Sequence, residues 1–516
     1  MKLLKLLEKL DYEWALGTME GDSPKGMSAE KGWNQTREFR QNVLDREISS
    51  VVYDSRYVIP GCIFVCIKGA VYDGHEFADI AVEKGAAAIV VSGAITSVTG
   101  EDVAVIRVED TRYALAFISA AWFGYPAQKL KVIGITGTKG KTTTTYLVKS
   151  ILEQAGLRVG LIGTIETIVG DTHFAAGNTT PESYLLQEDF AKMAEAGVDV
   201  VVMEVSSQAL KLHRTQGFVF DYGVFTNLES DHIGAGEHTS FEEYLMCKGL
   251  LFRQCRIGIV NGDDVHMEQV VAGHCCELET YGMGEGCMLR AEHPELVHTA
   301  GEIGVDFHVA GLLDFDVEVP FPGRFSVYNA LCAIAVCRHF QVEIWAMQKA
   351  IKTAKVKGRI EKVKISDQYT LLIDYAHNAM ALENLLVSLR EYHPKRLVCV
   401  FGCGGNRSRQ RRYEMGEVSG RLADLTVITS DNPRFEEPQA IIEDIKIGIK
   451  RTKGAYVEIC DRREAIAYVI SHAREGDFIV LAGKGHEDYQ EIKGKKYPMD
   501  ERVIIEEIVR NSSLLK

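Results

Sequence analysis

The stretch of this chain best suited to chemistry is Gly137-Thr-Lys-Gly-Lys-Thr-Thr143. An apolar run, Val132–Ile135, precedes it and a helical pattern follows, so a strand is expected to turn into a helix through a glycine-rich loop. Such a loop points backbone N–H groups at a phosphate, with Lys141 as a point charge and Thr142 placed for Mg²⁺. The sequence therefore predicts a nucleoside triphosphate site. The strict G-x-x-x-x-G-K-[ST] spacing is not met, because Ile135 replaces its first glycine, and a tight strand-to-helix corner is the alternative.

Lys248 is the second residue with chemical potential. Ser240-Phe-Glu-Glu243 is a capping box, which predicts that a helix starts there. Helical spacing then places Lys248 on the same face as Tyr244 and Leu251. Because burying a bare ammonium is costly, we expect Lys248 to be neutralised, paired or chemically changed. The alternative is a lysine at the edge of the face that extends its ammonium into water.

Glu204 and His232 are candidate metal ligands. Glu204 ends an apolar run, where a carboxylate is out of place unless it is functional. His232 follows the polar segment 227–231 at another predicted strand end. A lone histidine is more often structural, but beside a phosphate loop it becomes a candidate for Mg²⁺ or substrate contact.

The elements that must position these residues are short apolar strands alternating with helical patterns. This alternation predicts parallel sheets covered on both faces, an α/β fold. In such sheets ligands bind at the carboxyl ends of the strands. Six predicted strand ends carry polar clusters: Glu204–Ser207, Thr226–Leu228, Asp374–His377, Gly402–Gly405, Asp431–Arg434 and Gly483–Glu487.

The length of 516 residues is too great for one core and predicts two to four domains. We place boundaries near residues 110 and 357, which gives domains 1–110, 111–357 and 358–516. Residues 17–40 are polar without periodicity and are expected to form a loop to which no role is assigned.

Composition excludes several classes of protein. A net charge of −14 without a basic stripe argues against nucleic-acid binding. No apolar stretch is long enough to span a bilayer, and residues 1–10 predict an amphipathic helix rather than a signal peptide. The twelve cysteines lack paired metal-type spacing, which indicates reduced thiols in a cytoplasmic protein.

In order along the chain, the motifs resemble the Mur ligase family. The resemblance runs from about residue 45 to residue 516 and is specific to members that add the third residue of the peptidoglycan stem peptide. It implies a UDP-binding α/β domain, a central P-loop ATPase-type parallel sheet and a C-terminal Rossmann-like domain that binds the amino acid. The matching positions are Tyr53–Arg56, Gly137–Thr143, Asn178–Pro181, Glu204–Ser207, Asn227–His232, Lys248, Asn329, Asp374–His377 and Gly483–Asp488.

The resemblance implies that ATP phosphorylates a carboxylate and that an amine attacks the acyl phosphate to give an amide. It implies two Mg²⁺ ions and a CO₂-derived carbamate on Lys248. The implied catalytic residues are Lys141, Glu204, His232 and Lys248, and the implied metal ligands are Thr142, Glu204, His232 and carbamylated Lys248. The implied ATP contacts are Gly137, Thr138, Lys139, Gly140, Lys141, Thr142, Thr143, Asn329, Arg359, Asp374 and His377.

The substrates implied by the resemblance are UDP-MurNAc-L-Ala-D-Glu and meso-diaminopimelate. Arg434 would bind the carboxylate that distinguishes diaminopimelate from L-lysine, because its planar fork suits that group. L-Lysine or another diamino acid is the alternative, as is an Arg434 that only pairs with Glu436 or Glu437. The implied contacts are Tyr53, Ser55, Asn178, Thr179, Thr180, Ser206 and Arg214 for the UDP substrate, and Arg407, Asp431, Asn432, Pro433, Arg434, Gly483 and Glu487 for diaminopimelate.

Three other functions compete with this interpretation: a Mur-type ligase for another amino acid or a folylpolyglutamate synthase, a nucleotide-gated binding protein without catalysis, and a P-loop kinase. Asp431–Arg434 and Tyr53–Arg56 argue against the first, and the presence of all four implied catalytic residues argues against the second. A kinase would not need the amine-binding residues of the C-terminal domain. We expect a cytoplasmic monomer, without nucleic-acid partners or membrane insertion, that serves peptidoglycan synthesis and hence cell wall biogenesis, cell shape and division.

Overall fold

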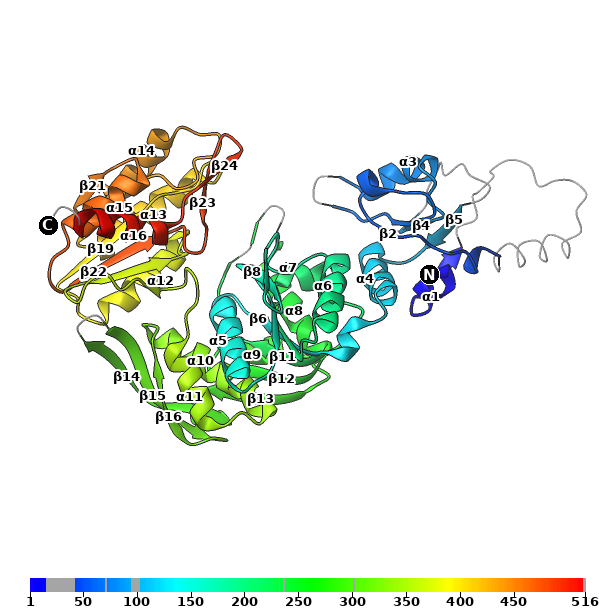
Figure 1. Ribbon diagram of the computed structural model, residues 1–516, viewed down its shortest axis with the longest axis horizontal. Coiled ribbons are helices and arrows are strands. Elements are labelled where there is room, and N and C mark those ends of the chain that lie inside the picture. Colours follow the sequence, from blue (N-terminus) through cyan, green and yellow to red (C-terminus); the bar gives the residue numbers. More distant parts are fainter. Residues whose placement is uncertain are drawn as a thin grey trace, which may run out of the picture. The chain divides into compact units, whose positions relative to one another are not determined.

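The computed structural model describes residues 1–14, 42–69, 72–93, 103–231, 233–234, 237–299 and 302–513 (Figure 1). Its residues form two compact units. The first comprises residues 1–141, 156–260 and 264–279, and the second comprises residues 142–155, 261–263 and 280–516. The predicted polar segment 17–40 lies outside the described residues.

The first unit begins with a small sheet of five strands, in the order β1-β5-β4-β3-β2. Four of them are parallel, and β1 runs antiparallel to β5. The β3 and β4 strands are buried along their whole length, as expected for a parallel sheet covered on both faces. The elements of this part are α1 (Leu3–Leu7), β1 (Glu13–Trp14), β2 (Val51–Val52), β3 (Ile63–Val65), α3 (Ala78–Glu83), β4 (Ala88–Val91), β5 (Ala104–Arg107) and α4 (Thr111–Trp122).

A larger sheet in the same unit has the strand order β12-β11-β6-β10-β7-β8-β9. Its first five strands are parallel, so their carboxyl ends share one edge, and β8 and β9 add an antiparallel hairpin. The elements are β6 (Lys131–Thr136), β7 (Val159–Ile162), β8 (Glu166–Val169), β9 (Thr172–Ala175), α6 (Ser183–Glu195), β10 (Val200–Glu204), α7 (Ser207–Lys211), β11 (Phe220–Phe225), α8 (Phe241–Gly249), β12 (Cys255–Asn261) and α9 (Met267–Val270).

The second unit contains α5 (Lys141–Gln154) from Thr142 onward, and a meander in which β14 (Leu289–Thr299), β15 (Glu302–Gly311) and β16 (Phe315–Val319) are antiparallel. The β13 strand (Glu277–Gly282) pairs in parallel with β14. Helix α10 (Arg324–Cys337) is buried almost all round, and α11 (Ile344–Thr353) follows it.

The chain after residue 358 builds a six-stranded sheet in the order β17-β18-β22-β19-β20-β21, parallel except for β17. Its strands are β17 (Glu361–Lys362), β18 (Thr370–Asp374), β19 (Arg396–Phe401), β20 (Leu425–Ile428), β21 (Tyr456–Glu458) and β22 (Asp477–Ala482). Its helices are α12 (Ala379–Arg390), α13 (Arg409–Leu422), α14 (Pro438–Ile449), α15 (Arg462–Ser471) and α16 (Glu501–Ser513), and β23 (Tyr489–Ile492) and β24 (Lys495–Pro498) form a hairpin.

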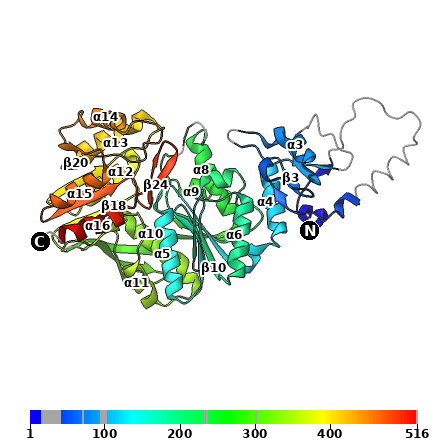
Figure 2. The same ribbon diagram turned by 45° about the horizontal axis from the view of Figure 1, so that its top comes forward.

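Successive residues of these strands enter opposite cores, because side chains alternate across a sheet. In β22, Phe478 and Val480 pack with α12, α13 and α14, whereas Ile479 and Leu481 pack with α15 and α16. Figure 2 shows the two groups of helices on opposite faces of the sheet. The strands are apolar along their whole length because helices cover both faces of the sheet, as the sequence predicted.

Several expectations about elements are confirmed. Glu204 is the last residue of β10, and α8 begins after Ser240, whose hydroxyl accepts a hydrogen bond from the Glu243 amide. The Glu243 carboxylate accepts from Thr239 N–H rather than from the Ser240 amide, so the cap is displaced by one residue. The twelve cysteines are free. Across the described ranges, no helix is long and apolar enough to cross a membrane.

Candidate active site

The phosphate loop follows β6 at the carboxyl edge of its sheet. Gly137 has a φ of 149°, and a Cβ atom there would lie 1.9 Å from the Thr226 hydroxyl oxygen, so only glycine fits. Lys141 Nζ donates to the carbonyls of Gly137 at 2.8 Å and Thr138 at 3.1 Å. The Lys141 side chain therefore bends back over the phosphate loop, and its ammonium lies where a bound phosphate would contact it.

The residues after β11 hold this loop in place. The Asn227 amide accepts from Lys139 N–H at 2.9 Å and donates to Lys139 O at 3.1 Å, and Thr226 Oγ1 donates to the same carbonyl at 2.7 Å. Two strand ends that lie far apart in the sequence therefore fix one loop. This agrees with the prediction that polar residues gather at this edge.

Lys248 is buried beside the loop, with 1% of its surface exposed. Its Nζ donates to Gly137 O at 2.9 Å and lies 4.4 Å from the centre of the Tyr244 ring. Burial, assisted by the positive charge of Lys141, lowers the pKa of the Lys248 ammonium well below its ordinary value. An ammonium that reaches into water is therefore wrong for Lys248, and burial shifts this group toward its uncharged form.

Tyr244 is a residue of the site that the sequence analysis placed only on the apolar face of a helix. Its hydroxyl lies 3.0 Å from Thr138 Oγ1, which in turn accepts a hydrogen bond from Glu229 N–H. The side chain thus connects helix α8 to the phosphate loop and covers Lys248. Its position one helical turn before Lys248 was visible in the sequence, but the partner of its hydroxyl was not.

We expect Tyr244→Phe to lower kcat about five-fold, since it deletes one hydrogen bond to the loop and keeps the ring over Lys248. Steady-state kinetics with ATP varied will measure the effect. The matched control is Tyr222→Phe in β11, and a control of equal effect would show that loss of a tyrosine hydroxyl elsewhere in this unit suffices.

Glu204 has 1% of its surface exposed, and Thr164 helps to orient its carboxylate. Thr164 donates its amide to Glu204 Oε1 at 2.9 Å and its hydroxyl to Oε2 at 3.0 Å. Thr164 also lies 3.0 Å from Thr179, hydroxyl to hydroxyl, so it connects Glu204 to a predicted substrate residue. The sequence offered no signal for Thr164.

The predicted substrate residues Thr180, Ser206 and Arg214 meet in the structure. Thr180 Oγ1 accepts from Ser206 N–H at 3.0 Å, and the Thr180 carbonyl accepts from Arg214 Nη1 at 3.1 Å. Glu182 lies 3.5 Å from Arg214 and 2.8 Å from Arg112, which the sequence analysis did not single out. A row of half-buried charges thus supports this part of the site.

The remaining predicted contacts of the UDP substrate lie on other segments of the first unit. Tyr53 packs on Tyr184 with ring centres 6.0 Å apart, and burial raises the pKa of its phenol to about 12. Ser55 opens a short 3-10 turn (Ser55–Tyr57), and Asn178 is exposed in a loop. Among the described residues, the hydrogen bonds of Thr180 and Ser206 go to other partners than Asn178 and Ser55.

In the second unit, Arg359 is the centre of the predicted nucleotide residues. Its Nη2 donates to Thr142 Oγ1 at 3.5 Å, and its guanidinium lies 4.9 Å from the centre of the Tyr375 ring.

The other predicted nucleotide residues of this unit are Asp374, Asn329 and His377. Asp374 accepts from the amides of Ile360 and Ala376 at 2.8 Å each, and burial raises the pKa of its carboxyl. Asn329 is buried and accepts from Thr144 Oγ1 at 3.4 Å, whereas His377 is exposed and contacts the Tyr375 carbonyl.

The 431–434 and 483–487 motifs meet through Lys484, which the sequence analysis passed over. Its Nζ donates to Asn432 Oδ1 at 2.9 Å and to Glu487 Oε2 at 2.8 Å, and it also contacts the Tyr489 carbonyl. Asn432 Nδ2 donates to the same Glu487 oxygen at 2.9 Å. Gly483 lies against Asp431, whose carboxylate oxygen would be 2.9 Å from a Cβ there. The two motifs are therefore one cluster.

Arg434 lies at the edge of this cluster with a φ of 51°. Its Nε donates to Glu491 at 3.1 Å and its Nη1 to the Gly405 carbonyl at 2.9 Å. Within the described part of the chain, Nη2 has no hydrogen-bond partner, and a quarter of the side chain is exposed. Of the two partners suggested from the sequence, Glu436 or Glu437, neither is the one observed, because Arg434 pairs with Glu491 and Glu436 pairs with buried Arg412.

Some predicted residues cannot be placed together. His232 lies outside the described residues, and Arg407 is exposed next to the 402–405 turn. No group of three histidine, cysteine, aspartate or glutamate side chains converges among the residues described. Among the predicted ligands, the Glu204 carboxylate in the first unit and the Thr142 hydroxyl in the second are each hard oxygen groups of the kind that Mg²⁺ prefers, so these residue types fit the ion.

Comparison with known proteins agrees with this geometry. Residues 47–123 match the Mur ligase catalytic domain, residues 135–337 the Mur ligase middle domain, and residues 358–485 the Mur ligase glutamate ligase domain. The UDP-N-acetylmuramoyl-L-alanyl-D-glutamate–2,6-diaminopimelate ligase of Caldanaerobacter subterraneus is 42% identical over 90% of this chain and 95% of its own.

The ligase of the same name from Clostridium tetani is 39% identical over 99% of both chains. A solved structure of a ligase of this name superposes with a TM-score of 0.66 at 28% identity, covering 91% of this chain and 96% of its own. The three-domain architecture expected from the sequence is confirmed. With these matches and the loop, lysine and carboxylate described above, the chain belongs to the Mur ligase family.

Proposed function

We propose that this protein is the ATP-dependent ligase that joins meso-diaminopimelate to UDP-MurNAc-L-Ala-D-Glu. The proposal rests foremost on Lys248, which is buried against the phosphate loop where burial lowers the pKa of its amine, because a phosphotransferase has no need of such a lysine there. The names and the identity of the relatives support it. Coupling proceeds through an acyl phosphate, which the diaminopimelate amine attacks to form the amide and release phosphate.

The roles of the chain's residues follow from their positions. The loop amides of residues 137–143 and Lys141 hold the ATP phosphates, and Arg359, Asn329, Asp374 and His377 bind the nucleoside. Positioning and neutralisation of charge are the main requirements of phosphoryl transfer, so this loop supplies most of the catalysis. Two Mg²⁺ ions, when bound, would neutralise charge on the transferring phosphoryl group. Their proposed ligands are Thr142, Glu204, His232 and carbamylated Lys248.

Lys248 serves this role after modification. Its uncharged amine attacks the carbon of CO₂: a C–N bond forms as one C=O π bond opens onto its oxygen, and the nitrogen releases a proton to solvent, which leaves a carbamate anion. Burial favours the reaction because it keeps the amine unprotonated. The modified side chain turns a cation into a carboxylate-like oxygen ligand beside Gly137.

The acceptor is bound by the cluster of residues 431–434 and 483–487. The free Nη2 edge of Arg434 would bind the second carboxylate of diaminopimelate, and Asp431 and Glu487 would lie near its ammonium groups. L-Lysine lacks that carboxylate, so its use is the main alternative. Arg407, Asn432, Pro433 and Gly483 complete the proposed contacts.

Phosphate release by the purified protein tests the proposal directly. With ATP, Mg²⁺ and UDP-MurNAc-L-Ala-D-Glu present, we expect release with meso-diaminopimelate at least about 10²-fold faster than with L-lysine. Mass analysis should show the amide product. Equal release with L-lysine would keep the ligase and discard the role of Arg434, and absence of release with both would contradict the proposal.

We further propose boundaries near residues 110 and 357, a monomeric cytoplasmic enzyme, and a role in cell wall biogenesis, cell shape, division and the cell cycle. Sedimentation of the purified protein will test the monomer.

A further inference from the structure

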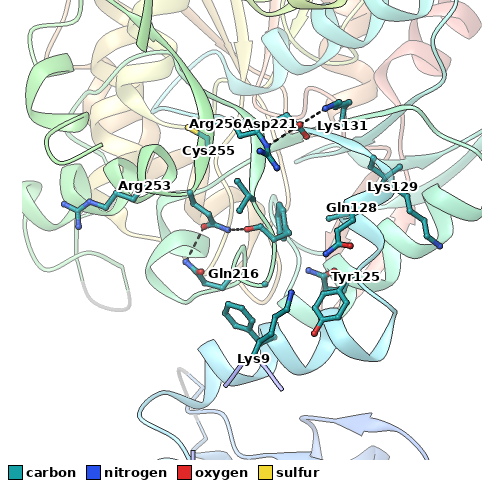
Figure 3. A pocket seen from close by; sticks show the side chains of 18 of the residues that line it. Lys9, Tyr125, Gln128, Lys129, Lys131, Gln216, Asp221, Arg253, Cys255 and Arg256 are labelled. Carbon is teal, nitrogen blue, oxygen red and sulfur yellow. Dashed lines mark hydrogen bonds and ion pairs between the residues drawn. The ribbon is translucent and has the colours of Figure 1, made fainter. Parts of the chain in front are cut away.

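A cavity of about 740 Å³ lies in the first unit at the end of the large sheet opposite the phosphate loop (Figure 3). It is lined by Lys131 at the start of β6, Asp221 near the start of β11 and Cys255 at the start of β12. Because these strands are parallel, the cavity lies at their amino ends. The six residues of β6, at roughly 3.3 Å each, place it about 20 Å from the loop.

The lining of the cavity is cationic in a protein that is strongly anionic overall. Five lysine and arginine side chains line it, against the two carboxylates of Asp199 and Asp221. Both carboxylates are already paired: Asp221 lies 2.9 Å from Lys131, and Asp199 lies 3.3 Å from Arg158. The other cations are Arg256, which lies 3.8 Å from the same Asp221, and Lys9, Lys129 and Arg253; the Lys9 Nζ lies 4.0 Å from the centre of the Tyr125 ring. The surplus positive charge favours an anion.

Gln187 provides an independent sign of a ligand. It lines the cavity from helix α6 with 1% of its surface exposed, yet neither its Nε2 nor its Oε1 has a hydrogen-bond partner among the residues that the structure describes. A buried amide without partners is costly, and the described residues leave both its donor and its acceptor available. By contrast, nearby Gln254 is satisfied by Gln216 and by the Phe218 carbonyl.

We propose that this cavity is a second ligand site, separate from the catalytic centre, for a small anion that carries a planar donor–acceptor edge. The Gln187 amide would pair with that edge, as a glutamine pairs with a nucleobase. The rings of Tyr125 and Phe218 offer surfaces for a flat group, and Lys9 and Lys129 would bind a phosphate or carboxylate. A nucleoside monophosphate has the required combination.

Isothermal titration with guanosine 5′-monophosphate tests the proposal, on the full chain saturated with a non-hydrolysable ATP analogue and UDP-MurNAc-L-Ala-D-Glu. We expect saturable binding, weakened about ten-fold or more by Gln187→Leu and by Lys129→Glu. Guanosine and inorganic phosphate, titrated separately, should each bind more weakly, because each offers only half of the complementary chemistry. Lys192→Glu, on the same helix as Gln187 but outside the cavity, should bind as the parent does.

A second readout does not depend on the probe. Without ligand, Gln187→Leu should raise the unfolding temperature, because it removes a buried amide that lacks partners, while turnover at saturating substrates is retained. No saturable binding at about 10 mM probe, equal binding by both cavity variants, or displacement by ADP would overturn the proposal. None of these outcomes bears on the ligase reaction, which the phosphate-release assay tests separately.

Discussion

Replacing Lys248 by alanine is expected to lower the rate of phosphate release by about 10³-fold or more. The change removes the side chain that donates to Gly137 O and that would carry the carbamate oxygen ligand, and loss of a metal ligand costs several kcal/mol of transition-state stabilisation. Single-turnover assays with ATP and the UDP substrate will measure the chemical step apart from product release.

The cavity left by the alanine provides a way to separate chemistry from packing. Short carboxylic acids such as acetate should restore part of the activity of Lys248→Ala, because a carboxylate can occupy the place of the carbamate. They should not restore Lys248→Met, whose side chain fills the space without an oxygen ligand. Lys211→Ala is the matched control. Lys211, at the end of α7, pairs with Glu243 on α8, the helix that carries Lys248, and its loss should leave activity unchanged. Full activity of Lys248→Ala would contradict the carbamate role.

The second large effect is expected at Arg434. Arg434→Ala should lower kcat/KM for diaminopimelate by about 10²- to 10³-fold, because truncating one partner of a charge-assisted pair costs roughly 2–5 kcal/mol. KM for ATP should remain unchanged, since the arginine contacts none of the nucleotide residues. Arg434→Lys keeps the charge but loses the fork, so we expect an intermediate loss.

Glu491→Gln is the control for the structural role of Arg434. It weakens the 3.1 Å pair that holds the guanidinium but leaves the Nη2 edge available, so its effect on diaminopimelate should be small. Thermal unfolding of each variant completes the test. If Arg434→Ala lowers the unfolding temperature and harms ATP and diaminopimelate use alike, Arg434 is a structural residue.

Much of the fold followed from local patterns in the sequence. Uninterrupted apolar runs predicted parallel strands, and the structure buries both faces of β10 and β22. A carboxylate after such a run marked Glu204 as the end of a strand, and helical spacing put Lys248 on the apolar face of α8. These inferences succeeded because each depends on residues within one or two turns, where periodicity and chain geometry decide the outcome.

The supporting residues could not be predicted in the same way. Thr164 orients Glu204 across 40 positions of sequence, and Tyr244 contacts Thr138 across 106. A threonine or a tyrosine in a single sequence has many possible partners, and only the three-dimensional packing selects one. Lys484 was similarly unrecognised, because its burial depends on Asn432, 52 positions earlier. Contacts of this range carry no local signature.

The parallel order of the large sheet also governs how the protein acquires its structure. The central strand β6 pairs with β10 and β11, and Lys131 meets Asp221 across 90 positions of sequence. Loop-closure entropy must be paid before such ladders form, so folding of this region is expected to be slow. Unpaired apolar strands are exposed meanwhile and can associate between chains. Refolding from denaturant should therefore give yields that fall steeply as protein concentration rises.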